Sequence, residues 1–190
     1  MKLFIKNMVC SRCIMVVKSE LEKLGLHPVN VVLGEVELIE DALTVAQVTN
    51  IGNAMTALGF ELIDNGKTRI IEKIKTSVID LIHYNGSPNR ERYSDYLSKE
   101  LHYEYSYISK LFSEVESITI EQYIINQKVE KIKEYIVYNE LSLGQIADKM
   151  GYSSVAHLSA QFKKVIGLPP SHFRNIGLHQ RMSLDVVGKQ

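Results

Sequence analysis

The chain has 190 residues, enough for one or two domains, and its 45% hydrophobic and 23% charged residues are typical of a soluble globular protein. The formal net charge is zero, but residues 1–66 hold 5 Lys and Arg against 8 Asp and Glu, whereas residues 67–190 hold 17 against 14. This small positive excess has the sign expected of a nucleic-acid-binding domain. No apolar run is long enough to span a membrane and the first residues do not form a signal peptide, so we expect a cytoplasmic protein.

The first 66 residues predict a small domain in which strands and helices alternate. Short apolar runs, several of them rich in Val, indicate strands, and apolar residues at helical spacing indicate helices. The predicted elements are strand 3–5, helix 14–24, strand 28–33, strand 36–40, helix 45–58 and strand 60–63. This order is the ferredoxin-like arrangement.

Cys10 and Cys13, the two cysteines of the chain, lie between the first strand and the first helix. Two thiolates three positions apart at a helix start can face one ion, and the helix N-terminus lowers thiol pKa values. Soft sulfur ligands select soft ions, and a two-ligand site suits monovalent copper, whereas zinc prefers four ligands. Met8 is expected to pack beneath the loop, and a vestigial or redox-active dithiol stays open as the alternative.

The pattern Met8-x-Cys10-x-x-Cys13, followed later by Gly59-Phe60, resembles the heavy-metal-associated domains of copper chaperones and metal-pumping ATPases. Asn7 stands where that family usually has Gly. The resemblance covers the first third of the chain. It implies that Cys10 and Cys13 are metal ligands and that copper is the metal.

A connecting helix is predicted after the seam at Asn65-Gly66-Lys67. Apolar residues recur at helical spacing from Ile70 to Ile82, and the helix is expected to end near residues 85–88. Its apolar face belongs either to a core or to a dimer seam. His27 and His83 are expected at the surface.

Residues 93–140 predict a first helix pair and a long helix. Ser94 is the expected N-cap of a helix over 97–101, and a second helix is expected over 105–112. Thr119 and Gln122 form a capping-box pattern at the start of a helix that continues to about Tyr138. The residues expected in the core are Tyr107, Ile108, Leu111 and Phe112. Lys128, Lys131 and Lys133 are expected on a solvated face, with phosphate contact as the alternative.

A second helix pair is predicted from Ser142 onward. Ser142 and Gln145 form another capping box, and Gly151 stands where the first helix must stop. Ser153 is the expected N-cap of the next helix. The apolar faces of the two helices are expected to hold Ile146, Ala147 and Met150, and then Leu158, Phe162 and Val165. This is the pattern of a helix-turn-helix, whose second helix can enter a DNA major groove.

The second pair resembles the second helix-turn-helix of AraC-type transcription regulators. The residues that carry the resemblance are Ile146-Ala147, Gly151-Tyr152, Phe162-Lys163-Lys164, Gly167, Pro169-Pro170 and Phe173-Arg174. The first pair matches less well, because Ser98 and His102 replace a small Ala and a turn Gly. The alternative is a helical pair without a DNA role. The expected fold class is α+β: a ferredoxin-like βαββαβ domain at 1–66, then an all-α AraC-type domain at 67–178 with two helix-turn-helix units joined by a long helix, and a tail at 179–190.

By family position, the DNA-reading residues are expected near the N-termini of the second helix of each pair. They are Tyr105, Ser106, Ser109 and Lys110 in the first pair, and Val155, Ala156, His157, Ser159 and Ala160 in the second. Lys110 can reach guanine or phosphate, and His157 can donate to a base edge. Lys163, Lys164 and Arg174 are either phosphate contacts or solvated charges.

The sequence therefore predicts a regulator that binds double-stranded DNA sequence-specifically and responds to copper or another soft metal through its two cysteines. A soft-metal-trafficking protein, whose helical half docks partners, is the alternative. No carboxylate pair, nucleophile–base set or phosphate loop is visible, so the sequence does not predict an enzyme. RNA polymerase and a second copy of the chain are candidate partners.

Overall fold

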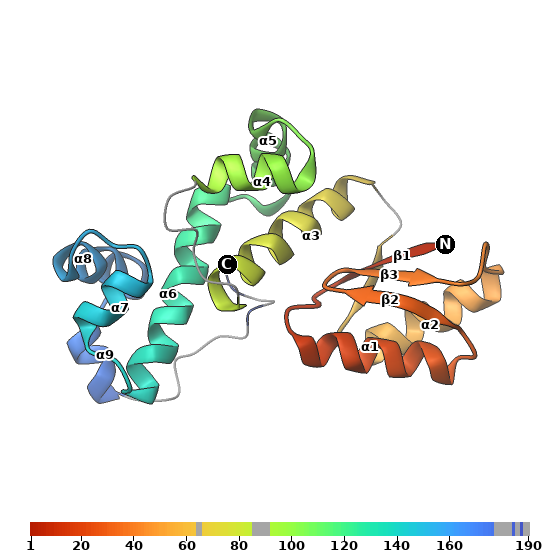
Figure 1. The fold of residues 1–190 in the computed structure, drawn as a ribbon, viewed down its shortest axis with the longest axis horizontal. Coiled ribbons are helices and arrows are strands. Elements are labelled where there is room, and N and C mark those ends of the chain that lie inside the picture. Colours follow the sequence, from red (N-terminus) through yellow and green to blue (C-terminus); the bar gives the residue numbers. More distant parts are fainter. Residues whose placement is uncertain (64–65, 85–91, 177–183, 185–186, 188–190) are drawn as a thin grey trace. The chain divides into compact units, whose positions relative to one another are not determined.

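The computed structural model describes residues 1–63, 66–84, 92–176, 184 and 187 (Figure 1). Backbone contacts divide the chain into two compact units, Met1–Thr76 and Ser77–Gln190, here called the N-terminal unit and the helical unit. Of the predicted seam, Asn65 lies outside the described residues, and Gly66 and Lys67 begin a helix. The predicted helix end at 85–88 and most of the tail at 179–190 also lie outside the described residues. Within the described ranges, no helix is both long and apolar enough to cross a membrane.

The N-terminal unit has the predicted order of strands and helices. Its elements are β1 (Lys2–Lys6), α1 (Ser11–Lys23), β2 (Pro28–Val32), β3 (Glu35–Leu38), α2 (Val45–Ala57) and β4 (Glu61–Ile63). The strands form one antiparallel sheet in the order β2-β3-β1-β4. Helix α1 begins at Ser11, before its predicted start, so Cys13 lies in the helix and not in the loop.

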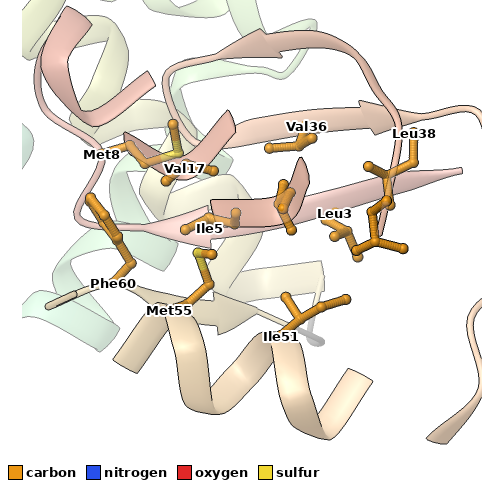
Figure 2. Packing of buried hydrophobic residues seen from close by; sticks show 11 residues of the cluster. Leu3, Ile5, Met8, Val17, Val36, Leu38, Ile51, Met55 and Phe60 are labelled. Carbon is orange, nitrogen blue, oxygen red and sulfur yellow. The ribbon is translucent and has the colours of Figure 1, made fainter. Parts of the chain in front are cut away.

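The core of the N-terminal unit lies between the sheet and helices α1 and α2 (Figure 2). Leu3 and Ile5 of β1 point into it, because alternate side chains of a strand share a face. Val17 of α1 and Met55 of α2 pack on them and are fully buried. Met8 is also fully buried in this cluster, which confirms its predicted place beneath the cysteine loop.

Helix α3 (Gly66–Ile79) begins in the N-terminal unit. The guanidinium of Arg69 lies 4.3 Å from the ring centre of Phe4, and Lys73 Nζ lies 3.2 Å from Glu35 Oε2. These contacts explain why the division between the units falls after Thr76, later than the domain boundary predicted after residue 66.

A π-helical turn, η1 (Asp80–Tyr84), follows α3 in the helical unit. Its His83 was predicted at the surface, but the side chain is half-buried, with Nε2 3.0 Å from Gln127 Oε1. Burial lowers the pKa of His83. His27, by contrast, is exposed as predicted.

The rest of the helical unit consists of two helix pairs on one long helix, as predicted. The elements are α4 (Tyr93–Leu101), α5 (Tyr105–Glu116), α6 (Ile120–Tyr138), α7 (Leu143–Lys149), α8 (Val155–Ile166) and α9 (Pro170–Ile176). Figure 1 shows α4 and α5 near the start of α6, and α7, α8 and α9 along its later part.

The predicted capping box at the start of α7 is confirmed. The Gln145 N–H donates to Ser142 Oγ at 3.3 Å, and the Ser142 N–H donates to Gln145 Oε1 at 2.9 Å. Gly151 ends the turn after α7 with a φ of +71°, a conformation that glycine adopts without a steric penalty. Three other helices end on left-handed residues that are not glycine: His102, Ser117 and Asn139.

Other predicted caps differ from the structure. The N-cap of α4 is Arg92 and not Ser94, and the N-cap of α8 is Ser154 and not Ser153. Thr119 caps α6 as predicted, but the Gln122 side chain donates to Asn126 instead of returning to the cap. The observed starts differ from the predicted ones by only one or two residues, and Arg92 caps α4 without a side-chain hydrogen bond, so the residue type alone leaves the helix start ambiguous.

Several predicted faces are also wrong. Tyr107 was expected in the core but is 46% exposed and packs beside Tyr103, and Val165 is 36% exposed. Conversely, Lys133 was expected in solvent but is 4% exposed, with its Nζ 2.8 Å from the buried Glu130 carboxylate. Lys131 is also largely covered and pairs with Glu134 of the same helix.

Candidate nucleic-acid interface

Helix α8 is the second helix of the α7–α8 pair, and its amphipathic sequence determines which side is buried in the core and which side is exposed. Leu158 and Phe162 are fully buried, and the Phe162 ring meets Phe173 of α9 edge-on at 5.5 Å. Ala156 and Ala160 are exposed on the rest of the helix. The two alanines leave the backbone of α8 accessible to a flat or grooved partner.

Helix α5 has the same arrangement in the first pair. Ile108, Leu111 and Phe112 are buried, and the Phe112 ring lies 5.5 Å from Tyr123 of α6. Ser106 and Lys110 are exposed, and Ser109 is half-buried. The Lys110 side chain is 80% exposed, with Glu114 at 4.0 Å as a loose neighbour.

Tyr105, a predicted DNA-reading residue, makes an intramolecular hydrogen bond. Its hydroxyl donates to Glu121 Oε1, at the start of α6, at 2.5 Å. Burial raises the pKa of Tyr105, and the hydroxyl in turn lowers the pKa of Glu121. The bond fixes the first turn of α5 to α6, so Tyr105 has a structural contact in addition to its predicted role.

His157 is exposed and is held by its neighbours. Its Nδ1 shares a hydrogen bond with Ser153 Oγ at 3.1 Å, and its ring meets the Tyr152 ring edge-on at 5.2 Å. Its backbone N–H donates to Ser154 Oγ, which caps α8. Because Nδ1 already shares a hydrogen bond with Ser153, Nε2 is, among the contacts of the described residues, the ring nitrogen available to hydrogen-bond a base edge.

The remaining predicted residues of the second pair follow the helix. Val155 is 40% exposed at the first position of α8, and Ser159 is half-buried. Lys163, Lys164 and Arg174 are exposed. The predicted readers of each pair therefore stand on one helix and largely on its exposed side, and their DNA contacts stay a prediction.

A cleft that the sequence did not predict lies where both helix pairs meet α6. Its volume is about 360 Å³. It is lined by residues of α4, α5, α6, the turn after α7, and α8, among them Tyr93, Tyr105, Lys128, Tyr152, His157 and Gln161. Lys128 follows buried Ile124 by four residues and precedes buried Ile132 by four, so helical spacing places it beside the apolar face.

The two cysteine thiols lie together in the N-terminal unit. The sulfur atoms are 3.3 Å apart, and both side chains are half-buried. Burial raises the pKa of the Cys13 thiol, against the lowering expected from the helix start. Among the described residues, no group of three or more His, Cys, Asp or Glu side chains is placed to share a metal ion.

Comparison with known proteins identifies the helical region. The sequence profile of a helix-turn-helix domain family matches residues 97–176. The chain is 30% identical over 104 residues to YdiP, an uncharacterized HTH-type transcriptional regulator of Escherichia coli (strain K12), covering 53% of this chain and 34% of that protein. It is 30% identical over 79 residues to the Msm operon regulatory protein of Streptococcus mutans, covering 41% of this chain and 28% of that protein.

A solved structure has a similar fold. The C-terminal domain of AraT, a response regulator from Geobacillus stearothermophilus, matches with a TM-score of 0.52 and 18% identity over 63% of this chain and 95% of that one. The chain spans about a third or less of the length of the relatives that it matches. Residues 97–176 therefore match a helix-turn-helix domain family, which agrees with the predicted resemblance of this region to AraC-type regulators.

Proposed function

We propose that this chain is a transcription regulator that binds double-stranded DNA sequence-specifically through α5 and α8. The observation that carries the proposal is the repeated arrangement. In each helix pair, one side of the second helix is buried and the opposite side is exposed to solvent. Both pairs pack on α6 within one domain that matches a helix-turn-helix family. Two recognition helices on one rigid helix suit two successive major-groove segments.

The contacts available for reading DNA are few and short. Among the predicted readers, Lys110, His157 and the hydroxyl of Ser106 are exposed and can hydrogen-bond base edges, while Val155 and Ala156 offer apolar contact to thymine methyl groups. Lys163, Lys164 and Arg174 supply positive charge for phosphates. Part of the sequence preference then comes from DNA shape.

Selection of binding sequences from a random duplex library tests the proposal. We expect one enriched sequence. Lys110→Ala and His157→Ala should bind it with reduced affinity because they remove predicted base contacts. Both side chains are exposed, so their removal should leave the fold intact. Lys18→Ala, which removes an exposed lysine of the N-terminal unit, is the control and should bind normally. A library that yields no enriched sequence would contradict the proposal.

We further propose that the N-terminal unit is a ferredoxin-like domain and that Cys10 and Cys13 hold one soft monovalent ion, such as copper. The fit is partial. The two sulfurs are neighbours and half-buried, but 3.3 Å is shorter than a linear two-thiolate site needs, about twice a metal–sulfur distance of about 2.3 Å. One thiol must therefore rotate for both to bind an ion. The ion would supply charge at this loop, and binding would change DNA affinity.

Titration with monovalent copper under reducing conditions tests this second proposal. We expect uptake of one ion per chain that is lost in Cys10→Ser/Cys13→Ser and retained in Ser11→Ala, which alters the exposed hydroxyl between the thiols. DNA affinity measured on the same samples should shift with copper in the wild type alone. Equal DNA affinity with and without copper would reject the coupling between metal binding and DNA binding. Contact with RNA polymerase and formation of a homodimer are separate proposals.

A further inference from the structure

The side chain of Lys128 leaves α6 at the cleft between the two helix pairs and contacts both of them. Its Nζ donates to the carbonyl oxygen of Met150 at 2.9 Å. The same ammonium lies 5.3 Å from the ring centre of Tyr93 and 5.3 Å from that of Tyr152. Tyr93 is the first residue of α4, whereas Met150 and Tyr152 lie in the connection between α7 and α8.

Each of these contacts is a favourable one for a cation. Met150 is the C-cap of α7, and carbonyl groups at a helix C-terminus lack intrahelical donors and carry partial negative charge. The faces of two tyrosine rings attract an ammonium, more strongly where water is displaced. Lys128 is half-buried, so the contacts are partly shielded from solvent.

The contact with Tyr152 continues into α8. Tyr152 is 8% exposed, and its hydroxyl donates to Gln161 Oε1 of α8. Burial raises the pKa of Tyr152 to about 12, so the hydroxyl keeps its proton and remains a donor. The Tyr152 ring also supports His157. One ammonium is thus joined to α4 on one side and, through Tyr152, to α8 and His157 on the other.

We propose that Lys128 is a positioning residue that fixes the offset between the two helix pairs, and therefore the spacing at which α5 and α8 read two DNA segments. The proposal rests on the proposed DNA-binding function for its consequence, but its geometric part concerns the protein alone. Lys128 needs no contact with DNA in this role.

A distance measurement without DNA tests the geometric part. Spin labels at Glu114→Cys on α5 and Lys164→Cys on α8, in a Cys10→Ser/Cys13→Ser background, should give a single narrow distance distribution. Lys128→Met should broaden it, because the shared cation is lost. Tyr93→Leu removes the ring on the α4 side alone and should broaden it as well, which keeps the test decisive if Lys128→Met does not fold.

Lys131→Met is the matched control for this measurement. It removes a positive charge from the same helix, but its ion-pair and ring partners, Glu134 and Tyr135, belong to α6 itself. Lys131 also lowers the pKa of His83, which lies in η1, outside both helix pairs. The distribution should stay narrow in this variant. An unchanged width in Lys128→Met and Tyr93→Leu would overturn the proposal.

The consequence for DNA is tested with the selected sequence and with copies that carry one inserted or deleted base pair between its two segments. Wild-type protein should lose at least about tenfold in affinity at each altered spacing, equivalent to about 1.4 kcal/mol. Lys128→Met should bind the native spacing more weakly and show a smaller penalty for the altered ones.

Two other outcomes separate the two proposals. A uniform loss of affinity at every spacing, with a salt slope shallower by about one, would identify Lys128 as a phosphate contact and overturn its positioning role. Absence of any selective DNA binding by the wild type would overturn the proposed function. In that case the label distances still decide whether Lys128 fixes the helix pairs.

Discussion

At the scale of single residues, the orientation of His157 is the feature closest to the proposed chemistry. Ser153 holds Nδ1 and Tyr152 supports the ring, so the imidazole presents Nε2 in a restricted set of orientations. A side chain that is fixed before binding loses less entropy when it meets a base edge. Ser153 is exposed, so its removal should affect His157 more than the fold.

We predict that His157→Ala reduces the free energy of binding to the selected DNA by about 1–3 kcal/mol and relaxes the preference at one base pair. Ser153→Ala should weaken binding less, with the loss confined to that same position, because the ring remains but is no longer held. Binding titrations against a panel of single-base variants measure both effects. An equal loss on every sequence would argue against base reading by His157.

His83 gives a second prediction at this scale, on pH. Burial is the main cause that lowers its pKa, and Lys131 adds to the lowering, while the Gln127 hydrogen bond and the Glu130 and Glu134 carboxylates oppose it. The folded protein therefore binds this proton less readily than the unfolded chain does. As the pH falls through about 6.5, the unfolded state takes up the proton first, and stability decreases.

Urea unfolding followed by helical circular dichroism at pH 7.5 and pH 5.5 measures this dependence. The wild type should lose more stability between the two pH values than His83→Gln, which has no imidazole to titrate. Both values lie above the range in which Glu35, Glu40 and Glu121, whose pKa values are lowered, take up protons. Identical pH dependence in the variant would exclude His83 as the source.

At the scale of the elements, helix α7 is short, and its ends determine its stability. Ser142→Ala should lower the free energy of unfolding by about 1 kcal/mol, because it removes the acceptor for the Gln145 N–H. Gly144→Ala in the same helix should raise it by about 0.5–1 kcal/mol, since a methyl group there would lie 3.9 Å from Ser142 Oγ, an ordinary contact. Chemical denaturation of both variants measures these two changes in the free energy of unfolding, one a decrease and one an increase, within the same helix.

The order of elements could be predicted from the sequence, because apolar spacing of two or of three to four residues reports directly on which face is buried. Helix starts were less predictable: adjacent Ser153 and Ser154 are both good N-cap residues, and only the backbone decides between them. The lysines of α6 were misplaced for a related reason. Lys133 pairs with Glu130, three residues earlier on the same helix, but the burial of that pair depends on tertiary packing. The bond from Lys128 to Met150 likewise joins residues far apart in the sequence.

The candidate site was predictable only in part. The resemblance to a known family predicted that α5 and α8 would carry the exposed DNA-reading residues, but it did not predict the contacts that hold these helices in place. Tyr105 bonds to Glu121, sixteen residues away, and Lys128 bonds to Met150, twenty-two residues away. Contacts between distant parts of a chain come from tertiary packing, which a local pattern does not encode.

At the scale of the whole molecule, the chain is two compact units with separate cores. We predict that Met55→Ala lowers the free energy of unfolding of the N-terminal unit by about 2–5 kcal/mol, because Met55 is fully buried there. Val45→Ala on the same helix should change it by less than about 0.5 kcal/mol, since Val45 is 84% exposed.

Hydrogen exchange resolved along the chain measures where the loss is felt. Protection in β1, β3 and α2 should fall in Met55→Ala, whereas protection in α6, α7 and α8 should remain. Equal loss in all six elements would show that the two units unfold together.

The residues that end α4 and α5 have left-handed backbone conformations, and replacing them can increase the thermal stability of the protein. Side chains at such φ values cost roughly 1–2 kcal/mol each, and His102 and Ser117 both carry that cost at +57° and +59°. Replacing each with glycine removes the clash at a position where helices commonly end on glycine. In a unit of the size of Ser77–Gln190, each kcal/mol recovered would raise the melting temperature by about 4 °C, so two surface changes would give a more stable form for crystallisation with DNA.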